Sequence, residues 1–475
     1  MEIDERLELM HGVQTSIWAR KVNQAINSGQ LCEWVSTFHP TRLPCQPDDS
    51  TKFRNGGYNL GQKVIFSDGT SWLVRFAQAG SVCDEYADEK VAVEVEALSL
   101  IRARTAIPVP AIHGWGSSEA DPLGLGPFII MDFIDGVPLQ DILKKEGQDE
   151  GIMRDDVADH DLEKIYRQMA RIFLQLFRLD FESIGSLPTP VTGFPASARP
   201  LTFKVHEIIQ QGGVGDRSLR FSDTVEYLRY VFGQDWEQLA RQANSVAGEH
   251  EGRRKLTTFN TVLSLIPSFV HAEYDWGPYK LVCDDFGLAN AIVRSRDDLT
   301  IVGIVDLEWS YAGPAQLFAS PWWLLQTRLS IYDAQRDKEA PEVLARFLRC
   351  LEIFKRVLKE EEAAMRGHES KELSSLVEWS HASGALWLHI LLSSGFNYPD
   401  SIPFAQLRDH FGADKFEQLN QRFLRTEVME ALVKKKMKQL MEYDDAFDQV
   451  QALKESQEAG DINEEEFLTE AAKLC

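Results

Sequence analysis

The stretch QKVIFSDGTSWLVRF (residues 62–76) places the strongest constraint on what this chain can fold into. Large apolar residues recur at every second position on both sides of the Asp68-Gly69 pair. An Asp-Gly pair between two alternating segments is the strongest short-range signal for a β-hairpin. The sequence therefore predicts two antiparallel strands, along which every second residue is apolar: Val64, Phe66, Trp72, Val74 and Phe76.

The residues after this hairpin change to a helical spacing. Between Asp88 and Arg104 the apolar residues recur every three or four positions, and two prolines, Pro108 and Pro110, follow. The segment FIIMDFIDG (128–136) then predicts a further buried strand. Residues 51–136 are therefore expected to form a small α+β unit.

The rest of the chain favours helices. Residues 1–50 begin with a helical pattern and end in a proline-rich connector. Helical patterns also cover 165–177, 221–250, 341–361 and 373–393. The sequence thus predicts an N-terminal helical extension (1–50), a β-rich lobe (51–136), a mainly helical lobe (137–427) and a charged C-terminal helix or frayed tail (428–475).

Charge and cysteine usage limit the possible partners. The 73 acidic and 50 basic residues of the 475-residue chain give a net charge of −23. This balance disfavours a protein that wraps nucleic acid or an anionic membrane, and it is compatible with an amine-bearing partner or with solubility alone.

The six cysteines include no CxxC pair, the N-terminus does not resemble a signal peptide, and no apolar run could span a membrane. We therefore expect a soluble, cytoplasmic protein; nothing indicates its oligomeric state.

One β insertion interrupts the helical half and carries the acids of chemical interest. In LVCDDFGLAN (281–290) an apolar pair runs into Asp284 and Asp285, and Asn290 follows five residues later. Two apolar runs, 291–293 and 300–305, predict a hairpin that ends at Asp306. Such a hairpin would bring Asn290 and Asp306 together, with Asp285 on the preceding loop. Oxygen ligands of this kind suit Mg²⁺, and a carboxylate beside them could take a proton from a hydroxyl. The alternative is a turn in which Asp285 bonds backbone amides.

These segments resemble the aminoglycoside phosphotransferase and choline kinase-like family. The family patterns His-Gly-Asp-x-x-x-x-Asn and Ile-Asp-Trp/Phe-Glu are matched here by CDDFGLAN and IVDLEW. The resemblance covers about residues 53–325, includes the looser blocks IPVPAIHGWG and GPFIIMDFIDGVPL, and is closest to the fungal branch. It implies a protein kinase-like two-lobe α+β fold, with a small β-rich N-lobe and a large, mainly helical C-lobe, and it implies ATP and Mg²⁺ as cofactors.

The resemblance also implies roles for individual residues. Asp285 would be the catalytic acid, and Asn290 and Asp306 would bind Mg²⁺. Arg75 would pair with Glu94. The remaining nucleotide contacts would come from Gly56 and Gly57 beside the phosphates and from the hinge from Met131 to Ile134, including Phe133, beside adenine.

Three positions depart from the family pattern. Cys283 replaces the histidine, Asp284 replaces the glycine, and Arg75 stands where protein kinases have lysine. A nucleophilic role for Cys283 is disfavoured, because neighbouring acids raise a thiol pKa. Asp284 is either a solvated acid or a substrate contact, and Arg75 is either a phosphate ligand or an exposed strand residue.

Residues near these segments are expected to be structural. Glu308 is expected to brace its loop, and Trp322 and Trp323 to pack in the core. His381 and His389 are expected to be packing histidines, with lining of an acceptor pocket as the alternative.

The predicted function is ATP- and Mg²⁺-dependent transfer of the γ-phosphoryl group to a hydroxyl of a small metabolite; the negative net charge leaves room for an amine-bearing acceptor and does not fix the substrate. The alternative is a catalytically inactive kinase-like nucleotide-binding or scaffold protein. A protein kinase is disfavoured, because after Asp306 the chain continues Leu-Glu rather than Phe-Gly. A Walker P-loop enzyme is excluded, because the pattern Gly-x-x-x-x-Gly-Lys is absent.

Overall fold

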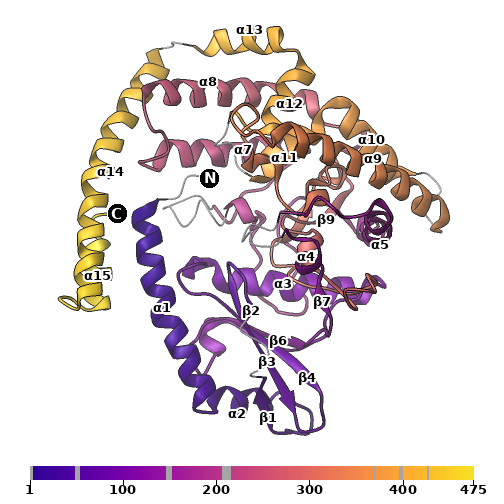
Figure 1. The fold of residues 1–475 in the computed structure, drawn as a ribbon, viewed down its shortest axis with the longest axis vertical. Coiled ribbons are helices and arrows are strands. Elements are labelled where there is room, and N and C mark those ends of the chain that lie inside the picture. The colour runs from indigo at the N-terminus through magenta and orange to yellow at the C-terminus, as the bar shows by residue number, and fades with distance from the viewer. Residues whose placement is uncertain are drawn as a thin grey trace.

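The chain folds into a small sheet-containing lobe and a larger helical lobe (Figure 1). The computed structural model describes residues 4–48, 54–145, 152–205, 216–366, 371–394, 399–424 and 427–475. The small lobe, drawn in indigo to purple, lies at the bottom of the view, and the helical lobe lies above it. This arrangement confirms the predicted α+β fold class with its two unequal lobes.

The small lobe is built on one antiparallel sheet. Its strand order is β1-β3-β4-β6-β5, and β2 pairs with β3. The predicted Asp-Gly hairpin is present as β3 and β4, and all five of its alternating apolar residues are buried. The strands are β1 (Cys45–Pro47), β2 (Arg54–Asn55), β3 (Asn59–Phe66), β4 (Ser71–Ala77), β5 (Ile112–Gly116) and β6 (Phe128–Asp132).

Helices cover both faces of this sheet. Residues from α1 (Glu5–Asn27) and α2 (Gln30–Ser36) share a core with the buried face of the hairpin. The predicted helix after the hairpin is α3 (Asp84–Arg104), and its apolar residues pack with those of β6. The N-terminal helices are therefore packed against the small lobe.

Two parts of the small lobe differ from the prediction. The proline-rich connector contributes strand β1, which pairs with β3 at the edge of the sheet. An edge strand tolerates Pro47 because its outer side has no ladder to complete. The strand predicted over 128–136 is shorter, since β6 ends at Asp132.

The large lobe consists mainly of helices. Two segments predicted as single helices are each two helices in the structure. The segment predicted as a helix over 221–250 is interrupted over 242–248. The segment predicted over 373–393 is broken at Gly384, whose φ of +78° ends the helix. The helices are α4 (Leu139–Leu143), α5 (Asp159–Phe177), α7 (Thr224–Arg241), α8 (Glu249–Leu265), α9 (Ala340–Ala364), α10 (Glu372–Ser383), α11 (Ala385–Ser394), α12 (Ile402–Phe411) and α13 (Ala413–Phe423).

Two small antiparallel sheets lie between the helices and hold the predicted acids. One has the order β12-β9-β8 and the other β11-β10-β7. The predicted hairpin is present as β10 and β11, in which Ala291 pairs with Ile304. The strands are β7 (Val137–Pro138), β8 (Asp180–Phe181), β9 (Tyr279–Cys283), β10 (Ala291–Val293), β11 (Ile301–Ile304) and β12 (Ser310–Gly313).

The C-terminal segment is helical and returns to the small lobe. Helices α14 (Glu427–Ala459) and α15 (Glu464–Ala471) run beside α1, as Figure 1 shows in yellow and indigo. Val450 and Phe467 share a small core with Val13 of α1, so this segment is a packed helix rather than a frayed tail. No helix in the described ranges is long and apolar enough to cross a membrane.

Candidate active site

The loop from Asp284 to Asn290 joins β9 to β10 and brings two predicted ligands together. The Val305 amide donates to the Asn290 carbonyl oxygen at 3.0 Å, and the Asn290 side-chain Nδ2 donates to the Asp306 carbonyl oxygen at 3.0 Å. The hairpin thus closes as predicted, with Asn290 at its entrance and Asp306 at its exit.

Asp306 has an unusual backbone conformation. Its φ is +63°, in the left-handed region that residues other than glycine rarely adopt. Such strain persists where the surrounding structure holds it, and it is concentrated at functional sites. The side chain remains 40% exposed, so its carboxylate is open to a ligand.

Arg75 on β4 connects Asp306 to the helix of the small lobe. Its guanidinium donates to Asp306 Oδ1 at 2.9 Å and forms a close ion pair with the buried carboxylate of Glu94 on α3. The predicted Arg75–Glu94 pair is therefore present. Because Arg75 is itself buried, it is not the exposed strand residue of the alternative interpretation.

A second buried cation, which the sequence analysis did not identify, lies beside Arg75. Lys90 on α3 forms an ion pair with Glu308 and donates to Asn59 Oδ1 at 2.8 Å, while Asn59 Nδ2 donates to Glu308 Oε2 at 2.6 Å. Burial alone would raise the pKa of Glu308, but Lys90 and Arg75 hold it below its ordinary value. Glu308 thus ties the loop after Asp306 to the small lobe, as expected. A sequence signal that could have identified Lys90 is its spacing of four residues before Glu94, which places both side chains on the same face of α3.

Asp285, the predicted catalytic acid, faces a different arginine. Arg328 Nη2 lies 3.5 Å from Asp285 Oδ1 and 3.4 Å from the Asp284 carbonyl oxygen. Burial among protein groups raises the pKa of Asp285 to about 6; Arg328 opposes the rise, and the nearby acids Asp306 and Glu308 add to it. Nothing local in the sequence pointed to Arg328, which lies 43 residues after Asp285.

Asp284 points to the other side of the loop. The Tyr311 hydroxyl donates to Asp284 Oδ1 at 2.8 Å, and burial raises the pKa of this carboxyl to about 6. Cys283 is a free cysteine whose thiol pKa is raised by burial and further by the two acids. A raised pKa disfavours the thiolate, which agrees with the prediction that Cys283 is not a nucleophile.

The predicted nucleotide contacts in the small lobe lie at the sheet. Gly56 and Gly57 are exposed in the turn between β2 and β3, and the Gly56 amide donates to the Asn59 carbonyl oxygen at 3.0 Å. The Met131 side chain is buried on β6. The Phe133 amide donates to the Ser71 carbonyl oxygen at 3.1 Å, so this amide is already engaged in the sheet.

The donor set at the hairpin fits Mg²⁺. Since the Asn290 side-chain nitrogen donates to the backbone carbonyl of Asp306, its side-chain oxygen is the atom left to face a cation, and this bond keeps the two residues adjacent. Mg²⁺ takes one or two protein oxygens and completes its shell with phosphate and water. No cluster of three or more His, Cys, Asp or Glu side chains among the described residues could hold a metal by itself. A site at Asn290 and Asp306 would therefore depend on ligands from a bound phosphate.

Comparisons with known proteins yield structural neighbours only. No family model matches the chain, and no curated protein matches it. The solved structures that are similar include a macrolide 2'-phosphotransferase from Brachybacterium faecium, at 11% identity and a TM-score of 0.39, covering 77% of this chain and 93% of that one.

Two further neighbours have similar scores. A thermostable mutant of an aminoglycoside phosphotransferase, solved with AMP-PNP and hygromycin B, is 12% identical with a TM-score of 0.40 and covers 82% and 94% of the two chains. An ethanolamine kinase from Plasmodium vivax is 13% identical with a TM-score of 0.39 and covers 82% and 83%. Because these TM-scores are below 0.5, the functional argument depends on the site itself. Membership of the family, and of its fungal branch, stays a prediction.

Proposed function

We propose that this chain transfers the γ-phosphoryl group of Mg²⁺-ATP to a hydroxyl of a small molecule. The observation that carries the proposal is the arrangement of charges at the two hairpin ends. Asn290 and Asp306 offer oxygen ligands, and the buried Arg75–Glu94 pair contacts Asp306 through Arg75. Asp285 lies on the loop that ends at Asn290. Phosphoryl transfer depends mainly on positioning and charge neutralisation, which this set of residues can supply.

In the proposed reaction, the protein itself takes part in one proton transfer. The acceptor oxygen forms a bond to the γ-phosphorus while the bond from that phosphorus to the bridging oxygen of ADP breaks. Asp285 orients the acceptor hydroxyl and takes its proton. Asn290 and Asp306 would hold Mg²⁺, which neutralises phosphate charge when it is bound. Arg75, fixed by Glu94, would contact phosphate oxygens in addition to Asp306.

A second candidate function is a nucleotide-binding module without transfer activity. It is supported by the hydrogen bond from Arg75 to Asp306, which occupies one carboxylate oxygen of the proposed metal ligand. The replacements at Cys283 and Asp284 also favour it. Such a module would bind Mg²⁺-ATP without consuming it.

Thermal unfolding with nucleotide tests the binding part of the proposal. We expect Mg²⁺-ATP to raise the melting temperature by several degrees, and ATP with EDTA to raise it much less, because the proposed site needs the metal to bind phosphate. Incubation with labelled ATP and a metabolite extract should then give a labelled small molecule. A metal-dependent shift without any labelled product would support the inactive module, and no shift at all would contradict both functions.

The raised pKa of Asp285 predicts a shifted pH profile. Only the ionised carboxylate can take a proton, so kcat/KM should be constant above about pH 7 and should fall roughly tenfold per unit as the pH drops below the pKa of about 6. The acid limb of kcat/KM in the free enzyme measures this pKa directly. An acid limb near the ordinary aspartate value of about 4 would contradict the assigned environment.

A further inference from the structure

Two of the cysteines lie side by side in the small lobe. Cys32 is on α2, and Cys45 is the first residue of β1. The Cys45 thiol donates to the Cys32 carbonyl oxygen at 3.5 Å, and the Cys32 thiol donates a hydrogen bond to the Cys45 sulfur. Both cysteines are free, so this contact joins two reduced thiols from different elements of the fold.

The surrounding structure holds the two thiols in this position. Helix α2 and the hairpin share a core, in which Cys32 is buried and Cys45 is half-buried. Cys45 pairs with Phe66 of β3 in the sheet, and Ser36 on α2 places its Oγ 3.7 Å from Cys45 Sγ. A helix and a sheet edge, rather than a loose loop, therefore bring the two sulfur atoms within reach of each other, which a disulfide requires.

The hydrogen bond between the two thiols makes their acidities different. The hydrogen bond from Cys32 lowers the pKa of Cys45 to about 7; burial opposes this change, and Ser36 adds to it. The same hydrogen bond, together with burial, raises the pKa of Cys32. Because the thiolate is the reactive form of cysteine, Cys45 is the attacking thiol of the pair and Cys32 keeps its proton.

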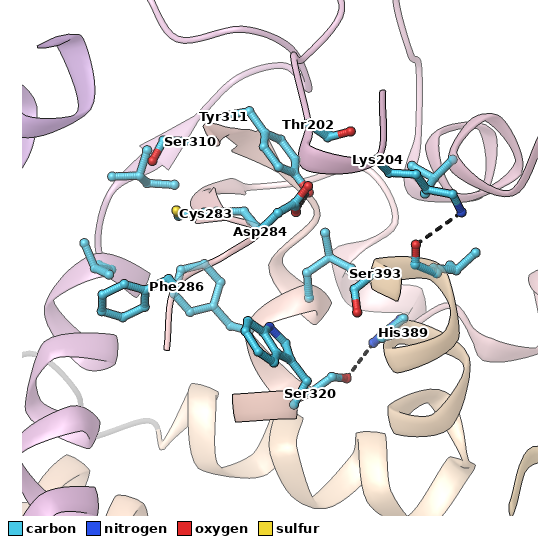
Figure 2. A pocket seen from close by; sticks show the side chains of 18 of the residues that line it. Thr202, Lys204, Cys283, Asp284, Phe286, Ser310, Tyr311, Ser320, His389 and Ser393 are labelled. Carbon is cyan, nitrogen blue, oxygen red and sulfur yellow. Dashed lines mark hydrogen bonds between the residues drawn. The ribbon is translucent and has the colours of Figure 1, made fainter. Parts of the chain in front are cut away.

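Cys283 lies in a different environment, which does not favour this chemistry. It lines a mostly apolar cavity of about 90 Å³ (Figure 2), where burial raises its pKa. The rest of the lining is packed core, as predicted: Trp323 stacks on Phe173 with ring centroids 5.3 Å apart, and His389 Nδ1 lies 2.7 Å from Ser320 Oγ.

The remaining cysteines also lack a second thiol beside them. Burial raises the pKa of Cys83, Cys350 and Cys475. Among the described residues, no hydrogen bond joins any of these three thiols to another cysteine. The pair at Cys32 and Cys45 is thus the place in the described structure where one thiol is activated and a second is ready to react with it.

We propose that Cys32 and Cys45 form an oxidant-sensitive pair, which a hydroperoxide converts into a disulfide between α2 and β1. The Cys45 thiolate attacks one oxygen of the hydroperoxide; a sulfur–oxygen bond forms, the oxygen–oxygen bond breaks, and the leaving oxygen takes a proton to become water or an alcohol. The Cys32 sulfur then attacks the sulfenic acid on Cys45. The sulfur–sulfur bond forms, and hydroxide leaves with the Cys32 proton as water. Overall, the two thiols lose two electrons and the hydroperoxide gains them.

The disulfide would fasten the N-terminal helices to the edge of the sheet. It closes a short loop between α2 and β1, which restricts the unfolded chain. A small thiol such as glutathione would reopen it by exchange. None of these steps uses a nucleotide, so the proposal stands or falls separately from the proposed function.

Peptide mapping of the oxidised full chain tests the proposal. Trypsin cuts after Lys21, Arg42 and Lys52, so the two cysteines fall in separate peptides, 22–42 and 43–52. After brief treatment of the folded chain with hydrogen peroxide, we expect these peptides to be linked, at about 2 Da below the summed mass of the two thiol peptides. Dithiothreitol should separate them. Peptides that stay unlinked while Cys45 or another cysteine is oxidised would overturn the proposal.

Two variants assign the roles within the pair. In Cys32→Ser the sulfenic acid on Cys45 has no thiol to react with, so dimedone, which captures sulfenic acids, should label Cys45 at least about fivefold more than in the unmodified chain. In Cys45→Ser, Cys32 should stay unoxidised, because its thiol is buried and protonated. Equal dimedone labelling of Cys32→Ser and the unmodified chain would overturn the role of Cys32.

A control variant and a second measurement keep the test independent of folding defects. Cys475→Ser removes an exposed cysteine and should leave the yield of linked peptides unchanged. Circular dichroism melting shows that each variant is folded. In the unmodified chain at pH 7, iodoacetamide should alkylate Cys45 at least about threefold faster than Cys475, since Cys45 is the more ionised thiol. Alkylation of Cys45 no faster than that of Cys475 would overturn its assignment as the attacking thiol.

Discussion

Asp285→Asn is expected to lower kcat by about 10³-fold or more while changing the Kd for Mg²⁺-ATP by less than about threefold. The asparagine side chain has nearly the same shape but cannot take the proton of the acceptor hydroxyl. The nucleotide contacts assigned to Arg75, Asn290 and Asp306 stay in place. Kinetics with the acceptor found in the extract screen, together with equilibrium titration of Mg²⁺-ATP, measure the two quantities separately.

A matched variant shows whether position rather than charge causes this loss. Asp297 lies in the exposed turn between β10 and β11, on the same hairpin but away from the loop of Asp285. Asp297→Asn should leave both kcat and the Kd for Mg²⁺-ATP within about twofold of the unmodified chain. If Asp285→Asn retained activity comparable to that of Asp297→Asn, Asp285 would not be the catalytic acid.

Asp306→Asn is expected to remove the dependence of nucleotide binding on the metal. In the unmodified chain, Mg²⁺ should tighten ATP binding by at least about tenfold, because the cation links the Asp306 carboxylate to the phosphates. The variant keeps an oxygen at this position but loses the charge, so the ratio of Kd values with and without Mg²⁺ should approach one and transfer should be lost.

The same variant distinguishes metal binding from general electrostatics. Removing a carboxylate near the phosphates also removes a repulsion, and it frees Arg75 from the hydrogen bond that it donates to Asp306. ATP binding in EDTA should therefore be unchanged or tighter. A variant that keeps the full Mg²⁺ effect would show that the metal is bound elsewhere.

The parts of the site that the sequence predicted depend on short-range patterns. The β10–β11 hairpin was evident from two apolar runs around a polar turn, and its closure alone placed Asn290 beside Asp306. The Arg75–Glu94 pair followed from the resemblance to a known family. Both predictions concern residues whose positions are fixed by strands and a helix with clear periodicity.

The parts that the sequence missed depend on distant segments. Arg328 reaches Asp285 from a turn beyond the hairpin, and no local pattern marks it. Helix breaks were also missed: an apolar spacing continues through Gly384, whereas the positive φ of this glycine ends α10 and redirects the chain into α11. Strand β1 was hidden by Pro47, which an edge position tolerates.

The location of the metal in a nucleotide complex tests the central claim most directly. Crystals of the full chain grown with Mn²⁺ and AMP-PNP should give an anomalous peak about 2.2 Å from the Asn290 side-chain oxygen and from an Asp306 carboxylate oxygen, with phosphate oxygens completing the shell. Asp285 should face the γ-phosphate without touching the ion. A well-ordered nucleotide whose metal contacts neither Asn290 nor Asp306 would contradict the account.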